Sequence, residues 1–410
     1  MRAFLGLVLA VAPLFADGIP RDEYRSRRAE LKKSLDGVMV LFGANESEDL
    51  RLPYLQETNF LYLSGWKEPG AVMMLTKNEE ILFLPERDRH AETFFGHRLA
   101  PGDADATQKS GFDKVMPYSA VESEFTRLLA TSRNVHTLSG DPNAEKLKAL
   151  APFHGDLTPA QTLIARLRVI KSPAEIELLT KAADATVAAH LAAWKMIKPG
   201  VYEYQIAAAM QGVYFSKGCE GNAYEPIVGS GANSIILHYS ANRRRADSGE
   251  VMLMDVGAEC SDYAMDVTRT VPVNGKFTPR QREIYEIVLG AQKAAIAALK
   301  PGAKMRGEGS LTEIVQKYFD SHGKDLHGDP LGKYFVHGLG HPVGLDVHDP
   351  GDTSTIKAGM VVTIEPGLYI PEESIGVRIE DTLLVTESGS KNLSGALPHE
   401  PDEIERLVGK

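Results

Sequence analysis

The sequence predicts an α+β protein in which a smaller α/β domain precedes a larger mixed domain. From residue 19 to 158, short apolar runs alternate with helical stretches, as is typical of a small α/β domain. A helix-start signal at residues 171–175 then marks a junction. Beyond it, two apolar segments that each carry a pair of carboxylates have the pattern of β-hairpins. The second domain is therefore expected at 170–410.

Composition excludes several classes of partner. The 410 residues are 43% hydrophobic and 24% charged, which is ordinary for a globular protein of two domains. The net charge is −10. Nucleic acid and anionic membranes both require a basic face, so neither is expected as a partner. No apolar stretch after residue 16 is long enough to span a membrane.

Residues 1–16 resemble a secretory signal peptide. Arg2 is followed by an apolar run from Ala3 to Phe15, which is too short to cross a bilayer. Cleavage after Ala16 is expected. Leu14 then occupies the −3 position of the cleavage site, where alanine would be a better residue. The mature chain would then be exported to the periplasm or secreted. The alternative is a cytoplasmic protein whose first residues form a buried strand.

The first domain is expected to shape a cleft without carrying chemistry. Its apolar runs are GVMVLFG (37–43), NFLYLSGW (59–66), AVMMLT (71–76) and EEILFLP (79–85).

The junction has an explicit helix start. Ser172 is placed as N-cap, Pro173 as the first helical residue and Glu175 as the third, which together form a capping box. Apolar residues then recur at helical spacing as far as Trp194, and Pro199-Gly200 stops the helix.

The first carboxylate pair lies in residues 251–271. Its apolar, β-branched ends predict two strands, with Asp255 opposite Asp266 and the turn at Cys260–Ser261. Opposed residues on one face of a hairpin have Cβ atoms about 4.5–5.5 Å apart. Two carboxylates that close repel each other unless a cation lies between them.

The second pair repeats the arrangement in residues 360–385. Glu365 opposite Glu380 puts the turn at Glu372–Glu373. Arg378 lies two residues before Glu380 and therefore shares its face.

Together the two pairs predict a two-metal site, because two divalent ions balance four carboxylates. A single carboxylate on a strand is more often a solvated edge residue. Burying several like charges together is costly, however, unless a cation balances them. The mostly oxygen ligands favour Mn²⁺ and tolerate Co²⁺ or Zn²⁺. His341, in VHGLGHPVGLDVHDPG, is a further candidate, although a lone histidine more often satisfies a core hydrogen bond.

Other catalytic patterns are missing from the sequence. HGLGH has no glutamate after its first histidine, as a zincin helix requires, and no G-x-S-x-G elbow is present. The only cysteines are Cys219 and Cys260, too few for a disulfide scaffold. Two free thiols are favoured over a bridge between them.

From about Ile170 to the C-terminus, the chain resembles the pita-bread metallopeptidase family, which contains methionine aminopeptidase, prolidase and aminopeptidase P. A weaker resemblance extends over the N-terminal part, where NFLYLSG is similar to a segment of aminopeptidase P and prolidase. The matching runs of the second domain are ILHYSAN (236–242), VMLMDVGAECSDYAMDVTRTVPVNGKFTPRQREIYEIV (251–288), VHGLGHPVGLDVHDPG (336–351), GMVVTIEPGLYI (359–370) and GVRIEDTLLVT (376–386).

The resemblance implies a pita-bread catalytic domain with two bound ions. The residues that match the family's metal ligands are Asp255, Asp266, His341, Glu365 and Glu380. Glu365 would also accept and return a proton, and Arg378 would orient carboxylates and water. His238 and His348 would contact the substrate and move protons, and His337 would bind substrate or hydrogen-bond behind the ligands. Tyr239 and Tyr369 are assigned to packing.

The implied activity is release of the first residue from peptides that have proline in second position. The N-terminal domain would wall one end of the cleft and bind the α-amino group. Prolidase, which cuts only dipeptides, has the same ligands and remains an alternative. A non-catalytic pita-bread binding module is a remote one, because such modules have usually lost ligands. Family members that combine such an N-terminal domain with a pita-bread domain are commonly dimers or tetramers. The resemblance therefore implies a homodimer or homotetramer.

Overall fold

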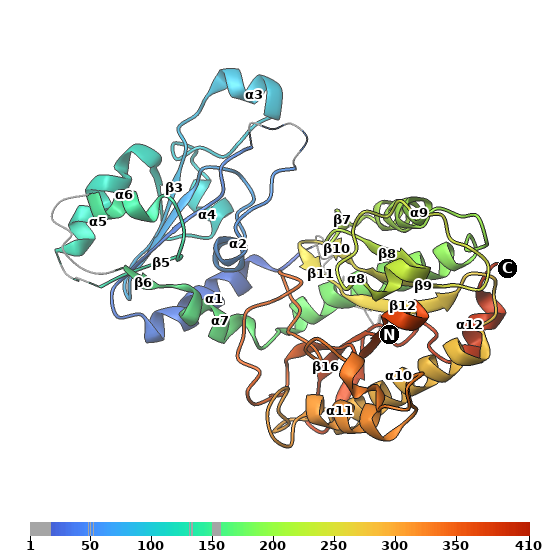
Figure 1. Ribbon diagram of the computed structural model, residues 1–410. Coiled ribbons are helices and arrows are strands. Elements are labelled where there is room, and N and C mark those ends of the chain that lie inside the picture. Colours follow the sequence, from blue (N-terminus) through green and yellow to red (C-terminus); the bar gives the residue numbers. More distant parts are fainter. Residues whose placement is uncertain are drawn as a thin grey trace, which may run out of the picture.

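The computed structural model shows two domains (Figure 1). It describes residues 18–47, 49, 51, 53–130, 132, 134–149 and 157–410. The predicted signal peptide, residues 1–16, therefore lies outside the described residues. Within the described part, no helix is both long and apolar enough to cross a membrane.

The first domain is built on a six-stranded sheet with the order β4-β3-β2-β1-β5-β6. Pairs β1–β5, β5–β6 and β3–β4 are parallel, whereas β2 is antiparallel to both of its neighbours. The elements are α1 (Arg21–Ser34), β1 (Val38–Phe42), α2 (Thr58–Ser64), β2 (Val72–Leu75), β3 (Glu80–Leu84), α3 (Arg89–Phe95), α4 (Ala106–Ser110), β4 (Lys114–Pro117), η1 (Tyr118–Ala120), α5 (Val121–Leu129), β5 (Val135–Thr137), α6 (Ala144–Ala149) and β6 (Leu157–Pro159).

Both faces of the sheet are buried at its central strands β1, β2, β3 and β5, whereas the edge strands β4 and β6 are more exposed. Met39 and Leu41 of β1 pack toward α1 and α2, whereas Val38 and Val40 pack toward α5 and α6. Strands covered on both faces are expected to be continuously apolar, as β1 and β2 are. The apolar run 59–66 differs from the other three because it forms α2 and the turn after it.

The second domain follows a connecting helix, α7 (Gln161–Arg168). Its elements are α8 (Pro173–Trp194), α9 (Glu203–Ser216), β7 (Gly221–Asn222), β8 (Ile227–Ser230), η2 (Gly231–Ile235), β9 (Val251–Val256), β10 (Ala258–Cys260), β11 (Tyr263–Ala264), β12 (Val267–Pro272), α10 (Pro279–Ala298), α11 (Leu311–Ser321), η3 (Leu331–Tyr334), β13 (Val361–Ile364), β14 (Gly367–Ile370), η4 (Pro371–Glu373), β15 (Ile375–Arg378), β16 (Asp381–Val385), β17 (Ser390–Asn392) and α12 (Pro401–Leu407).

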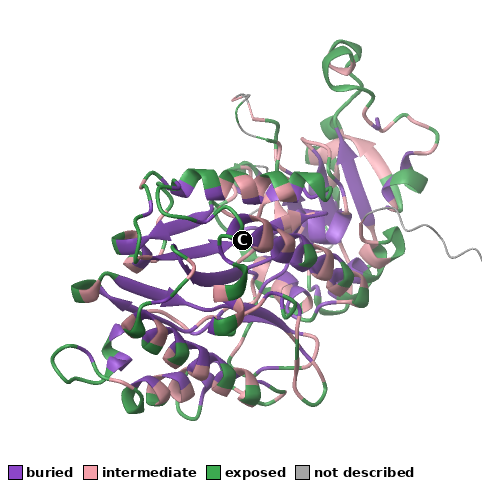
Figure 2. Cartoon of the chain, turned by 90° about the vertical axis from the view of Figure 1, so that its right-hand side faces the viewer, coloured by how far each residue is buried: buried purple, intermediate pink, exposed green. Residues whose placement is uncertain are grey.

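Two helix pairs enclose the strands of this domain. Helices α8 and α9 pack together on one side and α10 and α11 on the other, with the β9–β12 and β13–β16 hairpins between them (Figure 1). Figure 2 shows the strands buried and the outer faces of the helices exposed. Each half contributes one hairpin that carries two carboxylates, so the two halves repeat one arrangement around the centre of the domain.

The predicted start of α8 is confirmed. The Ser172 side chain accepts a hydrogen bond from the Glu175 backbone, and the Glu175 carboxylate accepts one from the Ser172 backbone. The helix ends at Trp194, a few residues before the predicted Pro199-Gly200 stop. Its burial on several faces is possible because alanines allow close approach of α9 and β10.

The predicted register of the first hairpin is wrong by two residues. Asp255 pairs with Thr268 rather than with Asp266, and the turn is at Ser261–Asp262. Both turn residues have positive φ, +52° and +69°, as a two-residue type I′ turn requires. Side chains alternate with a period of two, so this shift leaves Asp255 and Asp266 on one face as diagonal neighbours.

The predicted register of the second hairpin is confirmed. Ile364 pairs with Asp381 on one side, and Gly367 pairs with Arg378 on the other. Glu365 and Glu380 therefore lie opposite each other between these two stretches of pairing.

The prediction of two free thiols is wrong. Cys219, just after α9, and Cys260, at the end of β10, form a disulfide. The strand β7 returns from α9 to pair with β10, which brings the two positions together. Their separation of 41 residues in the sequence hides this proximity.

Candidate active site

The four predicted carboxylates lie at strand ends around one pocket. Asp255 is the penultimate residue of β9, and Asp266 directly precedes β12. Glu365 directly follows β13, and Glu380 directly precedes β16. The pocket has a volume of about 370 Å³ and is lined by Leu237, His238, Asp255, Asp266, Arg306, His337, Gly338, Gly340, His341, His348, Glu365, Arg378 and Glu380.

His341 reaches the carboxylates because its loop runs against β13. The Thr363 amide donates to the His341 carbonyl, and the His341 amide donates to the Thr363 hydroxyl. Gly340 makes this close approach possible, since a Cβ there would lie 2.1 Å from the Thr363 carbonyl oxygen. The His341 Nε2 atom lies 3.4 Å from Asp266 and 3.6 Å from Glu365.

Three of the five predicted ligands already have the spacing of a metal site. Ligand atoms of Asp266, His341 and Glu380 all lie within 4.8 Å of one another. Glu380 is buried, and its Oε2 accepts a hydrogen bond from Thr268 at 2.7 Å. Its other oxygen, Oε1, is buried without a hydrogen-bond partner among the described residues. A buried carboxylate oxygen needs a donor or a cation, so these residues fit a bound metal ion.

The pKa values show how strongly the carboxylates repel one another without cations. Burial and the carboxylates of Asp266 and Glu365 hold the pKa of Glu380 well above its usual range. Burial also raises the pKa of Glu365 to about 7. Burial raises the pKa of Asp255, against the opposing effect of Arg378. Divalent cations would favour the ionised form of each group.

His341 and Asp266 form a charged pair within this cluster. Burial opposes ionisation of both, but their mutual interaction outweighs it. The pKa of Asp266 is therefore lowered, and that of His341 is raised to about 9.

Arg378 is fixed by a network of buried hydrogen bonds. Its guanidinium donates to Asp255, to the Thr268 hydroxyl at 3.1 Å and to the Tyr369 hydroxyl at 2.7 Å. The Tyr369 hydroxyl also lies 2.9 Å from the His337 Nε2 atom. Tyr369, assigned to packing from the sequence, therefore links Arg378 to His337.

The three pocket histidines outside the ligand set differ in their environments. Both ring nitrogens of His337 are engaged, one with Tyr369 and one with the Gly338 carbonyl at 2.8 Å. Burial lowers the pKa of His337 to about 4, so the ring is neutral. His238 and His348 line the pocket, and neither has a hydrogen-bond partner among the described residues. Their ring nitrogens are thus available to a bound molecule.

The loop that carries His348 is clamped from the domain junction. Asp349 is buried and accepts from Arg168 at 2.6 Å and from Lys171 at 2.9 Å. Asp346 accepts from Arg168 at 2.7 Å and from Thr58 of α2 at 3.0 Å. The first domain and the connecting helix therefore hold the position of this pocket wall.

Tyr224 and Arg306 are site residues that the sequence did not indicate. The Tyr224 hydroxyl lies 2.6 Å from both Asp255 and Asp266, and it can donate its proton to only one of them at a time. It comes from the segment before β8, where no periodicity or motif signals a functional residue. Arg306 lies in the α10–α11 connection, whose sequence reads as an ordinary polar loop.

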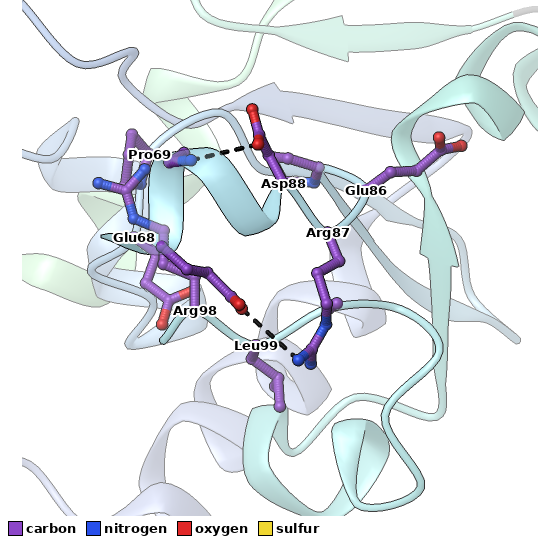
Figure 3. A pocket seen from close by; sticks show the side chains of 11 residues that line it. Glu68, Pro69, Glu86, Arg87, Asp88, Arg98 and Leu99 are labelled. Atoms are coloured by element: carbon purple, nitrogen blue, oxygen red, sulfur yellow. Dashed lines mark hydrogen bonds and ion pairs between the residues drawn. The ribbon is translucent and has the colours of Figure 1, made fainter. Parts of the chain in front are cut away.

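Two of the cavities in the described part of the first domain lack chemistry comparable to that of this pocket. One, of about 90 Å³, lies beside α3 (Figure 3). Its arginines are already paired, Arg87 with Asp103 and Arg98 with Glu46. The other, of about 420 Å³, lies at the carboxyl ends of β1 and β5. Its Glu57 and Asp141 are engaged in capping backbone amides.

The chain belongs to metallopeptidase family M24, whose model matches residues 177–387. The model of the aminopeptidase P N-terminal domain matches residues 24–136. The predicted pita-bread fold and the predicted enzyme class, a metal-dependent aminopeptidase, are thereby confirmed.

Relatives match the chain over nearly its full length. The Xaa-Pro aminopeptidase of Escherichia coli (strain K12) is 36% identical over 95% of this chain and 98% of its own. A solved structure of E. coli aminopeptidase P with the inhibitor Pro-Leu has a TM-score of 0.86 and 32% identity, covering 95% of this chain and 98% of that one. The Xaa-Pro dipeptidase of Pyrococcus furiosus is 41% identical, but over only 57% of this chain and 65% of its own.

Proposed function

We propose that the chain is an Xaa-Pro aminopeptidase, which releases the N-terminal residue from peptides with proline in second position. The observation that supports this most strongly is the cluster of four carboxylates and His341 in one pocket. One oxygen of the buried Glu380 has no hydrogen-bond partner among the described residues. Full-length similarity to Xaa-Pro aminopeptidases supports the substrate class.

Asp255, Asp266, His341, Glu365 and Glu380 would hold two divalent ions. Bound there, the ions would supply Lewis acidity and lower the pKa of a water molecule. The ligand set is four carboxylates and one imidazole, which favours Mn²⁺, with Co²⁺ or Zn²⁺ tolerated.

The chain's own side chains would handle the substrate and the proton. Glu365 accepts the proton of the attacking water and returns it to the leaving nitrogen. His238 and His348 line the pocket without a hydrogen-bond partner among the described residues, and they would contact the peptide. Arg378 holds Asp255 in orientation through a charge-assisted hydrogen bond. His337 supports this arrangement through Tyr369.

Prolidase is the second candidate, because dipeptidase similarity is strong over the catalytic half. The aminopeptidase similarity covers both domains, which favours the first proposal. The deciding experiment compares the peptides X-Pro-Y, X-Pro and X-Ala-Y with Mn²⁺ added. We expect release of X from X-Pro-Y and little cleavage of X-Ala-Y. Efficient cleavage of X-Pro with none of X-Pro-Y would establish a prolidase instead.

We further propose that the mature protein is exported and begins near Asp17. The apolar segment at residues 3–15 motivates this. The Cys219–Cys260 disulfide supports it, since disulfides persist in oxidising compartments. N-terminal sequencing of the native protein tests the proposal. An intact Met1 in the cytoplasmic fraction would refute it.

A further inference from the structure

Arg306 holds a positive charge on the wall of the active-site pocket. It lies in the α10–α11 connection, and its side chain lines the same cavity as the carboxylate cluster. A Cβ added to Gly338 would lie 2.7 Å from the Arg306 Nη2 atom, so the guanidinium lies directly over the backbone there. The loop is anchored just before it, because Met305 is buried and the Ala303 carbonyl accepts from the Ile356 amide at 2.8 Å.

This guanidinium has no partner within the described part of the chain. No carboxylate of the described residues forms an ion pair with Arg306, although Glu308 is two residues away. The other pocket arginine, Arg378, is buried and bound to Asp255, Tyr369 and Thr268. Two divalent ions would balance the four carboxylates, which leaves the charges of Arg306 and Arg378 in excess. Of these two arginines, only Arg306 lacks a partner among the described residues.

The charge of Arg306 indicates which end of a peptide it faces. The free α-amino group of a substrate is a cation, and a guanidinium repels it. An arginine presents a planar fork of donors that matches a carboxylate in two parallel hydrogen bonds. The complementary ligand is therefore a carboxylate on the leaving-group side of the scissile bond.

We propose that Arg306 forms an anionic subsite that binds a carboxylate of the peptide substrate beyond the proline. The carboxylate is either the C-terminus of a short peptide or the side chain of a downstream Asp or Glu. The assignment rests on the proposed aminopeptidase function and deepens it. It makes this enzyme selective for short peptides with a free C-terminus or for peptides with an acidic residue after proline.

Binding of product-like peptides tests the proposal without turnover. Calorimetry gives the Kd of Pro-Leu and of Pro-Leu amide for the wild type and for Arg306→Ala, Arg306→Lys and Lys304→Ala. Lys304 is an exposed cation in the same loop that does not line the pocket, and it serves as the matched control. A second pair, Pro-Glu amide and Pro-Gln amide, separates a side-chain carboxylate from a C-terminal one.

In at least one pair, we expect the wild type to bind the peptide that carries the carboxylate with a Kd about tenfold lower than that of its neutral counterpart. This ratio is the low end for a charge-assisted hydrogen bond. Arg306→Ala should lose this preference, Arg306→Lys should keep part of it, and Lys304→Ala should keep all of it. The pair that shows the preference identifies the source of the carboxylate. Equal Kd values in both wild-type pairs, or a preference that survives in Arg306→Ala, would overturn the assignment.

Kinetics separate this proposal from the proposed function. With the peptide that carries the preferred carboxylate, Arg306→Ala should raise KM by more than it lowers kcat, because the subsite contributes binding rather than chemistry. Lys304→Ala, outside the pocket lining, should change neither value. If no form of the enzyme cleaves X-Pro peptides, the proposed function fails, whereas the Kd ratios still decide the role of Arg306.

Discussion

His348 faces the pocket from a clamped loop, and its ring centroid lies 4.2 Å from that of His341. It is outside the predicted ligand set, so its removal should leave the metal bound. We predict that His348→Ala keeps its metal content but loses about 10²-fold in kcat, the usual scale for a residue that transfers a proton. Metal analysis and steady-state kinetics on X-Pro-Y measure both quantities. A folded variant that has lost its metal would make His348 a ligand instead.

Glu259 gives the stability of the fold a pH dependence. It lies on β10, where burial and the carboxylates of Asp262 and Glu220 raise its pKa to about 7 from an ordinary 4.5. The protonated form is favoured in the folded state, so this contribution to stability is complete below pH 4.5 and is lost as the pH rises through about 7.

Glu259→Gln should therefore unfold at the same temperature as the wild type at pH 4.5 and at a higher one at pH 8. A gain of about 1 kcal/mol at pH 8 is expected, because Glu259 is only partly buried and solvent screens the repulsion. Thermal unfolding at the two pH values measures it. Glu177→Gln on the exposed face of α8 is the control and should show no such pH-dependent gain. A variant that is less stable than the wild type at pH 8 would contradict this interpretation.

At the scale of elements, the loop that carries His348 depends on a buried ion-pair cluster. Asp349 binds Arg168 and Lys171, and the side chains of all three are about 1% exposed. Asp349→Ala leaves Lys171 buried without this carboxylate, so we predict a loss of about 3–5 kcal/mol in the free energy of unfolding.

Urea unfolding measures this loss, with Asp113→Ala as the control. Asp113 pairs with Arg25 on the surface, where both side chains are well exposed. Asp113→Ala should therefore lower the free energy of unfolding by about 1 kcal/mol or less. Similar losses in the two variants would show that the cluster at the domain junction does not hold the loop.

The Cys219–Cys260 disulfide closes a segment that contains β7, β8 and β9, and with them Asp255. The sequence separation of 41 residues gives a loop-closure stabilisation of about 4 kcal/mol at 25 °C. The double variant Cys219→Ala/Cys260→Ala should lose about this much in denaturant unfolding. Reductant should destabilise the wild type by a similar amount and leave the double variant unchanged. Indifference of the wild type to reductant would contradict the bridge.

At the scale of the whole molecule, the sequence predicted the fold where its signals are local. The capping box at Ser172 and the apolar strands on both sides of each carboxylate are such signals, and the second hairpin register followed from them. The register of the first hairpin was missed because its Ser261–Asp262 turn has positive φ without glycine or asparagine.

The remaining site residues depend on contacts between distant segments. Tyr224 reaches Asp255 and Asp266 because β7 and β8, on either side of it, pair with β10 and β9. Arg306 lines the pocket from a loop that lies over Gly338. The disulfide likewise joins two segments that only β7–β10 pairing brings together. No spacing in a single sequence encodes such contacts.

The central claim is that the buried carboxylate cluster binds two metal ions that activity requires. Inductively coupled plasma mass spectrometry of protein equilibrated with Mn²⁺ and then desalted measures this directly. We predict two ions per chain in the wild type, and fewer ions with no X-Pro-Y cleavage in Glu380→Ala. Full X-Pro-Y cleavage by wild-type protein that holds no divalent ion, or by a Glu380→Ala variant, would contradict it.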